Sequence, residues 1–216
     1  MNNYWIINFQ YQKIHYKLKI NIIGKLIIKM YKREIRILGI DDSPFRKFTS
    51  GNVLVIGTVF RGGILLDGVL TTKVAIDGSN STKKLIEMVN KSKFKPQLRC
   101  IMLNGIALGG FNVINIGELN KKTKIPVIVV IRKYPDFKKI EETLKRINKH
   151  SKYSLIQKAG PVEKAGQIYI QTKGISFEKA KQILKLTCTR SLIPEPIRVA
   201  HLIAGGVVTG ESKGKA

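Results

Sequence analysis

Apolar residues along the chain alternate between short runs typical of strands and a period near 3.6 typical of helices. Runs rich in Ile and Val predict strands at residues 35–40, 52–60, 64–76, 98–103, 126–131, 153–157 and 167–171. Helical spacing and capping residues predict helices that begin near Ser79 or Ser81, at Asn115 and at Pro135, and others that cover residues 176–187 and 196–204. The pattern therefore predicts an α/β protein.

Two parts of this pattern set the expected order of the sheet. The turn at residues 61–63, between closely spaced strands, predicts an antiparallel meander of the first three strands. The strand, helix and strand within residues 98–131 predict a parallel crossover, whose helix begins with the capping pair Asn115 and Glu118. This order is that of the ribonuclease-H-like fold, a three-layer α/β fold with a mixed sheet flanked by helices.

The chain is long enough for one sizeable core, and it is strongly basic. It has 216 residues, 44% of them hydrophobic, and residues 30–216 are expected to form a single domain. Lys and Arg number 39 against 14 Asp and Glu, which gives a net charge of +25. A gene rich in A and T would raise the content of Lys, but it would raise Asp and Glu as well. Since acidic residues are scarce here, such a bias alone does not explain the positive charge. Nucleic acid is therefore the expected partner.

Residues 1–29 form a basic extension that contains no acidic residue. Lysines interrupt it too often for a transmembrane segment, and it lacks the cleavage site of a signal peptide. Three interpretations remain open for it: a dispensable or misassigned start of the protein, a strip that lies on a membrane surface, and an extra hairpin at residues 16–30.

The two cysteines, Cys100 and Cys188, lie far apart in apolar segments. Neither belongs to a CxxC pair or to a Cys/His arrangement with metal-ligand spacing. Both are expected to be buried and reduced, as in a cytoplasmic protein, and no motif for a small-molecule cofactor is present.

Carboxylates at the end of the first clean strand are the leading candidates for chemistry. Asp41 and Asp42 stand where that strand stops and a turn begins. In an α/β sheet, ligands and metals bind at this edge. Ribonuclease-H-like nucleases hold divalent metal with carboxylates of the first and fourth strands, and the fourth-strand position here is Asn104. The two aspartates could instead only cap the turn at residues 43–44.

Further residues are candidates for the same site. Asp77 precedes the first helix, where an acid could ligate metal or only cap the turn. Gly109 and Gly110 could expose backbone N–H groups to a phosphate or simply allow a tight loop. Arg132 and Lys133 follow the next strand along the chain and could neutralise phosphate or remain solvated.

The histidines and the aromatic residues carry weaker signals. His201, in the last predicted helix, is expected to be a packed or surface residue rather than a ligand. His15 and His150 lie in basic segments. The aromatic residues are scattered along the chain, so no base-stacking platform is predicted.

Short blocks carry a family resemblance, and they occur at residues 39–41, 103–107, 125–130 and 193–201. In this order they resemble the blocks of endonuclease V, and the Pro-Glu-Pro-x-Arg-x-Ala stretch of the last block is the most specific. Residues 41–45, 109–112 and 210–212 also resemble an archaeal endonuclease-V-like family. The resemblance covers the chain from Met30 to its C-terminus.

The resemblance implies a metal site formed by Asp41, Asp77 and Asn104, with Mg²⁺ or Mn²⁺ as the cofactor. Endonuclease V has an aspartate where this chain has Asn104, so one negative charge is missing. The family's later histidine has no match at residues 172–175, and its aromatic-proline wedge is absent before Asp77. We therefore expect a nucleic-acid-binding protein with weak or lost phosphodiesterase activity. The alternative is a non-catalytic scaffold that uses the same cleft for a peptide or a nucleotide.

Overall fold

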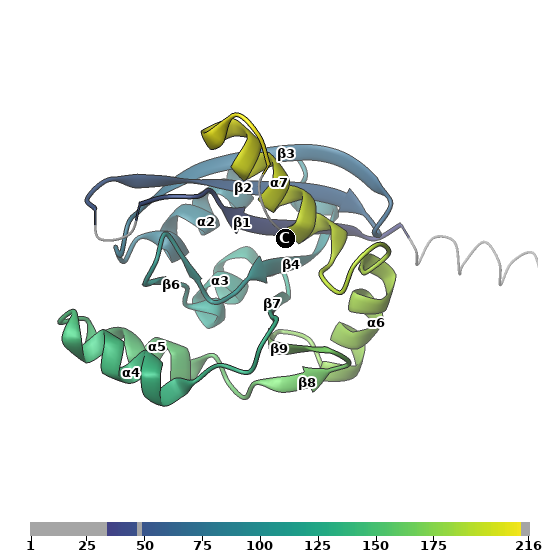
Figure 1. The fold of residues 1–216 in the computed structure, drawn as a ribbon. Coiled ribbons are helices and arrows are strands. Elements are labelled where there is room, and N and C mark those ends of the chain that lie inside the picture. Colours follow the sequence, from purple (N-terminus) through teal and green to yellow (C-terminus); the bar gives the residue numbers. More distant parts are fainter. Residues whose placement is uncertain (1–33, 47–48, 213–216) are drawn as a thin grey trace, which may run out of the picture. The chain divides into compact units, whose positions relative to one another are not determined.

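One mixed sheet organises the protein (Figure 1). In the computed structural model, which describes residues 34–46 and 49–212, this sheet has seven strands in the order β3-β2-β1-β4-β7-β9-β8. The strands are β1 Arg36–Asp42, β2 Asn52–Arg61, β3 Leu65–Ala75, β4 Leu98–Asn104, β7 Val127–Ile131, β8 Glu163–Ala165 and β9 Ile168–Lys173. A small second sheet pairs β5 Ala107–Leu108 with β6 Asn112–Val113. The helices are α2 Ser81–Lys91, α3 Ile116–Thr123, α4 Phe137–Arg146, α5 Tyr153–Lys158, α6 Phe177–Thr187 and α7 Glu195–Thr209, with 3₁₀ turns at Lys95–Gln97 and His150–Lys152.

The predicted antiparallel meander is confirmed. β1 pairs antiparallel with β2, and β2 pairs antiparallel with β3. Asp67 on β3 accepts hydrogen bonds from Arg61 on β2 at 3.0 Å and from Arg36 on β1 at 2.8 Å. These two guanidinium groups hold the pKa of Asp67 below its ordinary value. The ion pairs therefore join all three strands on one face of the sheet.

The predicted parallel crossover is confirmed as well. β4 pairs parallel with both β1 and β7, and α3 connects β4 to β7. The predicted helix start is also correct, because the side chain of Asn115 accepts the N–H of Glu118 at 3.0 Å. Since β1, β4 and β7 run in the same direction, their last residues, Asp42, Asn104 and Ile131, lie at one edge of the sheet.

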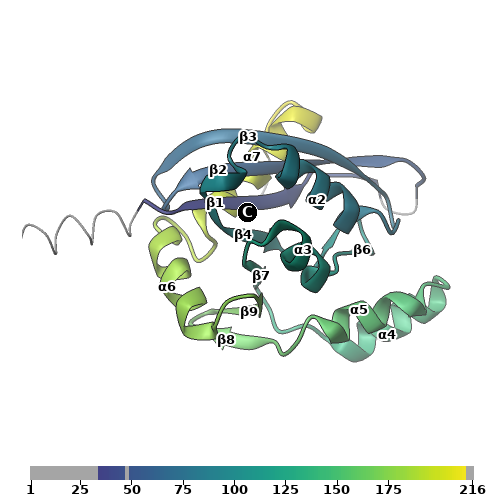
Figure 2. The same ribbon diagram turned by 180° about the vertical axis from the view of Figure 1, so that it is seen from behind.

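Helices cover both faces of the sheet. Figure 1 shows α7 in front of β1 and β2, and Figure 2, the view from behind, shows α2 and α3 on the opposite face. On the α2 and α3 face, Leu38 of β1 belongs to a buried cluster with Leu85 and Leu119. On the other face, Ile56 of β2 packs against Ala200 of α7. The two faces give the three-layer architecture that the order of elements predicts.

One predicted strand is wrong. Residues 153–157 form helix α5 rather than a strand. Tyr153 and Ile156 lie one helical turn apart, and both belong to a cluster around Leu144 of α4. Packing of this face against α4 outweighed the short alternating pattern on which the strand prediction rested.

Two helix ends differ from their predictions. Asn80, rather than a serine, is the N-cap of α2, and its side chain accepts hydrogen bonds from the Ala75 N–H at 3.0 Å and from Asn112 Nδ2 at 2.8 Å. α7 continues past residue 204 to Thr209 and ends at Gly210, which has a left-handed φ of 81°. The strands β5, β6 and β8 were not predicted, because each is only two or three residues long.

The described residues from Arg36 onward form one compact unit. Within residues 34–46 and 49–212, no helix is both long and apolar enough to cross a membrane. The basic extension predicted at residues 1–29 and His15 lie outside the described residues.

Candidate functional site

Asp41 and Asn104 meet at the carboxyl edge of the sheet. They lie at the ends of β1 and β4, which are adjacent parallel strands. Asn104 Nδ2 donates a hydrogen bond to Asp41 Oδ2 at 3.0 Å. The Asp41 side chain is deeply buried, with 3% of the residue exposed, and its Oδ1 accepts the N–H of Asp42 at 3.0 Å. The strand order thus brings the first-strand carboxylate to the fourth-strand amide.

A third side chain reaches Asp41 from α7. His201 Nδ1 lies 2.8 Å from Asp41 Oδ2. This hydrogen bond raises the pKa of His201, while burial and the positive charge of Arg132 lower it. The sequence interpretation treated His201 as a packed or surface residue and missed the contact. The sequence held a signal for it, because His201 lies four residues after the apolar Ile197 and three before the apolar Ala204. Both of these residues are fully buried, so His201 shares the helix face that lies toward the sheet.

Asp42 points away from this cluster, because successive residues of a strand face opposite sides of the sheet. Its Oδ2 accepts the N–H of Gly109 at 2.6 Å. Burial raises the pKa of Asp42 to about 6, the Gly109 N–H opposes the rise, and the charge of Asp41 adds to it. The N–H of Gly109 is therefore directed at a carboxylate of the protein, and its contact with a phosphate stays a prediction.

Asp77 occupies the turn between β3 and α2, and Gly109 connects it to the end of β1. Its N–H donates to the carbonyl of Gly109 at 2.7 Å, and its Oδ1 accepts the N–H of Phe111 at 2.7 Å. A Cβ on Gly110 would collide with Asp77 Oδ1, so glycine is required for this contact. The Asp77 carboxylate thus holds the β5–β6 loop, and its role as a metal ligand beside Asp41 stays a prediction.

Two lysines hold the backbone of this turn. Lys152, 8% exposed, donates hydrogen bonds to the carbonyls of Asp77 at 2.7 Å, of Phe111 at 2.8 Å and of Gly78. Lys149 donates to the same Asp77 carbonyl at 2.6 Å. Burial lowers the pKa of Lys152, and the charge of Lys149 lowers it further. The Lys152 ammonium therefore ties the β3–α2 turn to the β5–β6 loop.

Replacing Lys152 by methionine is expected to lower the free energy of unfolding by about 2–4 kcal/mol, because buried carbonyl groups lose their donor. Urea unfolding measures the change. The control is Lys158→Met, which removes an exposed lysine of α5 and is expected to change stability by less than about 0.5 kcal/mol. Equal stability of the two variants would show that Lys152 does not hold the turn.

Arg132 and Lys133 lie directly after β7, and both residues are exposed. The positive charge of Arg132 reaches His201, whose pKa it lowers. Because β7 neighbours β4 in the sheet, these two cations stand along the same edge as Asn104. Their contact with phosphate stays a prediction.

The oxygen atoms of Asp41 and Asn104 are of the kind that Mg²⁺ and Mn²⁺ take as ligands. Mg²⁺ in proteins usually keeps several waters and takes one or two carboxylates together with the phosphates of a substrate. Asp41 can supply a carboxylate and Asn104 a neutral amide oxygen. Within the described part of the chain, no group of three or more His, Cys, Asp or Glu is placed to hold a metal ion. An ion bound at this edge would need substrate and water to complete its ligand shell.

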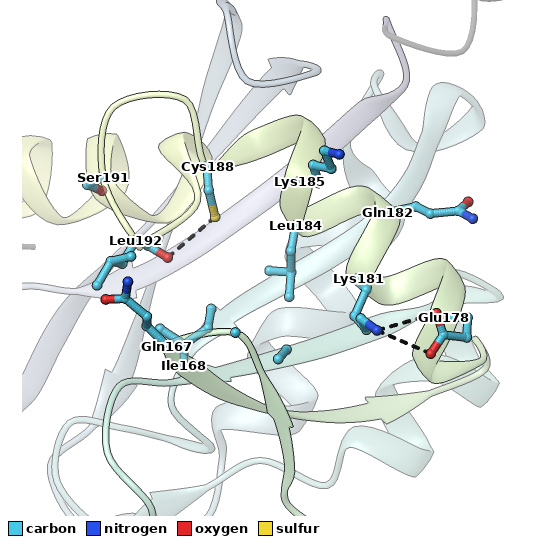
Figure 3. A pocket seen from close by; sticks show the side chains of 12 residues that line it. Gln167, Ile168, Glu178, Lys181, Gln182, Leu184, Lys185, Cys188, Ser191 and Leu192 are labelled. Carbon is cyan, nitrogen blue, oxygen red and sulfur yellow. Dashed lines mark hydrogen bonds and ion pairs between the residues drawn. The ribbon is translucent and has the colours of Figure 1, made fainter.

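A separate cavity of about 590 Å³ lies between α6 and the β8–β9 hairpin (Figure 3). Leu184 of α6 and Ile168 of β9 line it, together with Leu192, which is 53% exposed. None of the predicted site residues is among its lining residues. The candidate site is therefore identified by the side chains at the sheet edge and not by the size of this cavity.

Comparison with known proteins agrees with this architecture. A family profile described as endonuclease dU matches residues 33–208. A UPF0215 protein of Methanothermobacter thermautotrophicus is 51% identical over 87% of this chain and 95% of its own length. The crystal structure of an Archaeoglobus fulgidus protein of unknown function is 40% identical, with a TM-score of 0.75, and the match covers 80% of this chain and 98% of that chain. Ciona intestinalis endonuclease V, crystallised with inosine-containing DNA, is 16% identical with a TM-score of 0.50 over 83% of this chain and 94% of that chain. The fold is therefore the ribonuclease-H-like fold of endonuclease V, and the chain belongs to the endonuclease dU family.

Proposed function

We propose that this protein binds nucleic acid at the carboxyl edge of β1 and β4 and hydrolyses phosphodiester bonds there with the help of Mg²⁺ or Mn²⁺. The observation that carries the proposal is the meeting of Asp41, Asn104 and His201 at that edge. The family description points to DNA that contains deoxyuridine as the substrate.

Charge supports nucleic acid as the partner. The chain carries a net charge of +25, and Arg132 and Lys133 are exposed beside the candidate site. Ciona endonuclease V, which shares the fold, was crystallised with DNA. We further propose that the protein acts in the cytoplasm, in keeping with its two free cysteines. Cys100 is buried as expected, whereas Cys188 is only half-buried, contrary to the expectation.

Each residue of the cluster has its own part in the proposed reaction. Asp41 provides the charged ligand for the metal, and Asn104 provides a neutral one. The metal, when bound, lowers the pKa of a water molecule and stabilises charge on the phosphate oxygens. His201 orients the Asp41 carboxylate through its Nδ1 hydrogen bond, as outer partners of metal ligands do. Arg132 adds positive charge where the phosphate would lie.

The activity is proposed to be weak, because Asn104 carries no charge. A carboxylate at this position would attract the cation more strongly than an amide oxygen does. The carboxylates of Asp42 and Asp77 accept N–H groups of the β5–β6 loop, at Gly109 and Phe111, whereas Asp41 lies together with Asn104 and His201. Asp41 is therefore the principal charged ligand that the edge offers.

The test compares binding and cleavage of DNA duplexes that are identical except for one deoxyuridine, one inosine or neither. We expect binding to weaken steeply between about 50 and 200 mM salt, since each phosphate contact releases about one counterion. We also expect slow cleavage that needs Mg²⁺ or Mn²⁺ and is fastest with deoxyuridine. No binding at low salt would remove nucleic acid as the partner. Binding without cleavage in either metal would favour the non-catalytic alternative.

A further inference from the structure

An aromatic cluster lies just beyond the end of β7. Tyr134 is 58% exposed. Its ring meets that of Tyr169 at 5.4 Å between centroids and that of Phe137 at 6.0 Å, both edge to face. These contacts hold the ring in place while more than half of the residue remains open to solvent. A tyrosine packed in this way presents a rigid, flat surface for a ligand at a small cost in conformational entropy.

The cluster lies on the same sheet edge as the candidate site. β7 is two strands from β1, which is about 10 Å at the usual strand spacing. Arg132 and Lys133 connect the end of β7 to Tyr134. The charge of Arg132 lowers the pKa of His201, so Arg132 lies within electrostatic range of the Asp41 cluster.

We propose that Tyr134 stacks on an unpaired base of the bound nucleic acid, while Lys133 contacts an adjacent phosphate. This inference rests on the proposed function, which brings nucleic acid to the same edge. Every base has a flat face that can stack on an aromatic ring, and neighbouring cations pair with the backbone. The base must be unpaired, because a base inside a duplex is already stacked on its neighbours and has to be extruded first.

The charge around Tyr134 selects nucleic acid over an apolar protein partner. Asp136 is the acid nearest to the ring in sequence, and its Oδ1 is engaged in capping α4 through the N–H of Lys139 at 3.0 Å. The exposed cations in this part of the chain are Arg132, Lys133, Lys138 and Lys139. An exposed aromatic ring in a segment that carries several exposed cations fits a base and its phosphates better than it fits an apolar peptide.

The first measurement is the affinity for a single-stranded oligonucleotide and for a duplex with one bulged base. Tyr134→Ala is expected to bind both about 5- to 100-fold more weakly, whereas Tyr134→Phe keeps the ring and binds like wild type. Leu192→Ala is the matched control, because Leu192 is also exposed but lines the separate cavity. The affinity of this variant for both oligonucleotides is expected to equal that of wild type.

Salt separates stacking from charge. The loss caused by Tyr134→Ala is expected to be the same at low and at physiological salt, because stacking releases no counterions. Lys133→Ala is expected to make the slope of log affinity against log salt shallower by about 0.7 for the single strand, the value for one phosphate contact.

Fluorescence reports the contact directly. The tryptophan fluorescence of Tyr134→Trp is expected to be quenched when the oligonucleotide binds. Wild type, whose single tryptophan is Trp5, gives the baseline change in fluorescence. Wild-type affinity in Tyr134→Ala, or no quenching beyond the baseline in Tyr134→Trp, would overturn the stacking contact and leave the proposed function standing. Failure of wild type to bind either oligonucleotide at low salt would overturn both.

Discussion

Replacing Gly39 by alanine is expected to lower the free energy of unfolding by about 3 kcal/mol and to move α7 away from β1. A Cβ at this position would lie 2.5 Å from the Cβ of Pro196 and 2.6 Å from the backbone nitrogen of Ile197. A backbone atom can give way only if the first turn of α7 shifts. Because α7 carries His201, its contact with Asp41 is expected to weaken at the same time.

Urea unfolding measures the loss of stability, and cleavage of deoxyuridine-containing DNA measures the effect on the site. Gly206→Ala is the control within the same helix. Among the described residues its Cβ would meet only Ser212 Oγ, at an ordinary 3.6 Å. Because alanine is the better helix former, this variant is expected to be more stable by about 0.5–1 kcal/mol. If Gly39→Ala proved as stable as wild type, β1 and α7 could not approach each other as closely as the structure has them.

The elements that could be predicted from sequence are those with local signals. Asn115 and Glu118 form their cap within one turn, and the run of Val and Ile in β7 is buried as its composition indicates. The meeting of Asp41 and Asn104 followed from the strand order alone, because parallel neighbouring strands end at the same edge. The strand predicted at residues 153–157 was wrong because packing in the cluster around Leu144, and not a local signal, sets their conformation.

The rest of the candidate site depends on contacts between segments that are distant in sequence. His201 reaches Asp41 only because Gly39 lets α7 lie against β1. Lys152 is one of many lysines in the sequence, and only the fold places its ammonium among buried carbonyl groups. Tyr134 gains its partner Tyr169 through the pairing of β7 with β9. No spacing rule within a single element reports such contacts.

Asn104→Asp is expected to strengthen binding of Mg²⁺ or Mn²⁺ about tenfold and to raise cleavage by a similar factor, because it adds a charged ligand beside Asp41. It also removes the Nδ2 donor that now bonds Asp41 Oδ2. Two carboxylates then face each other, so without metal this variant is expected to be less stable than wild type. Asp41→Asn is expected to reduce cleavage about a hundredfold or more, since it removes the principal charged ligand.

Melting temperatures in EDTA and in Mn²⁺, together with cleavage rates, separate these effects. Asn104→Asp is expected to melt below wild type in EDTA and to gain more from Mn²⁺ than wild type does, because an ion that binds only the folded state stabilises it. Asn90→Asp adds the same charge at an exposed position of α2 and is expected to show neither change. A lower melting temperature in EDTA with no gain from metal, and no cleavage by wild type or any variant, would mean that the Asp41 edge holds no catalytic metal. The cluster of Asp41, Asn104 and His201 would then serve only to hold α7 against β1 and β4.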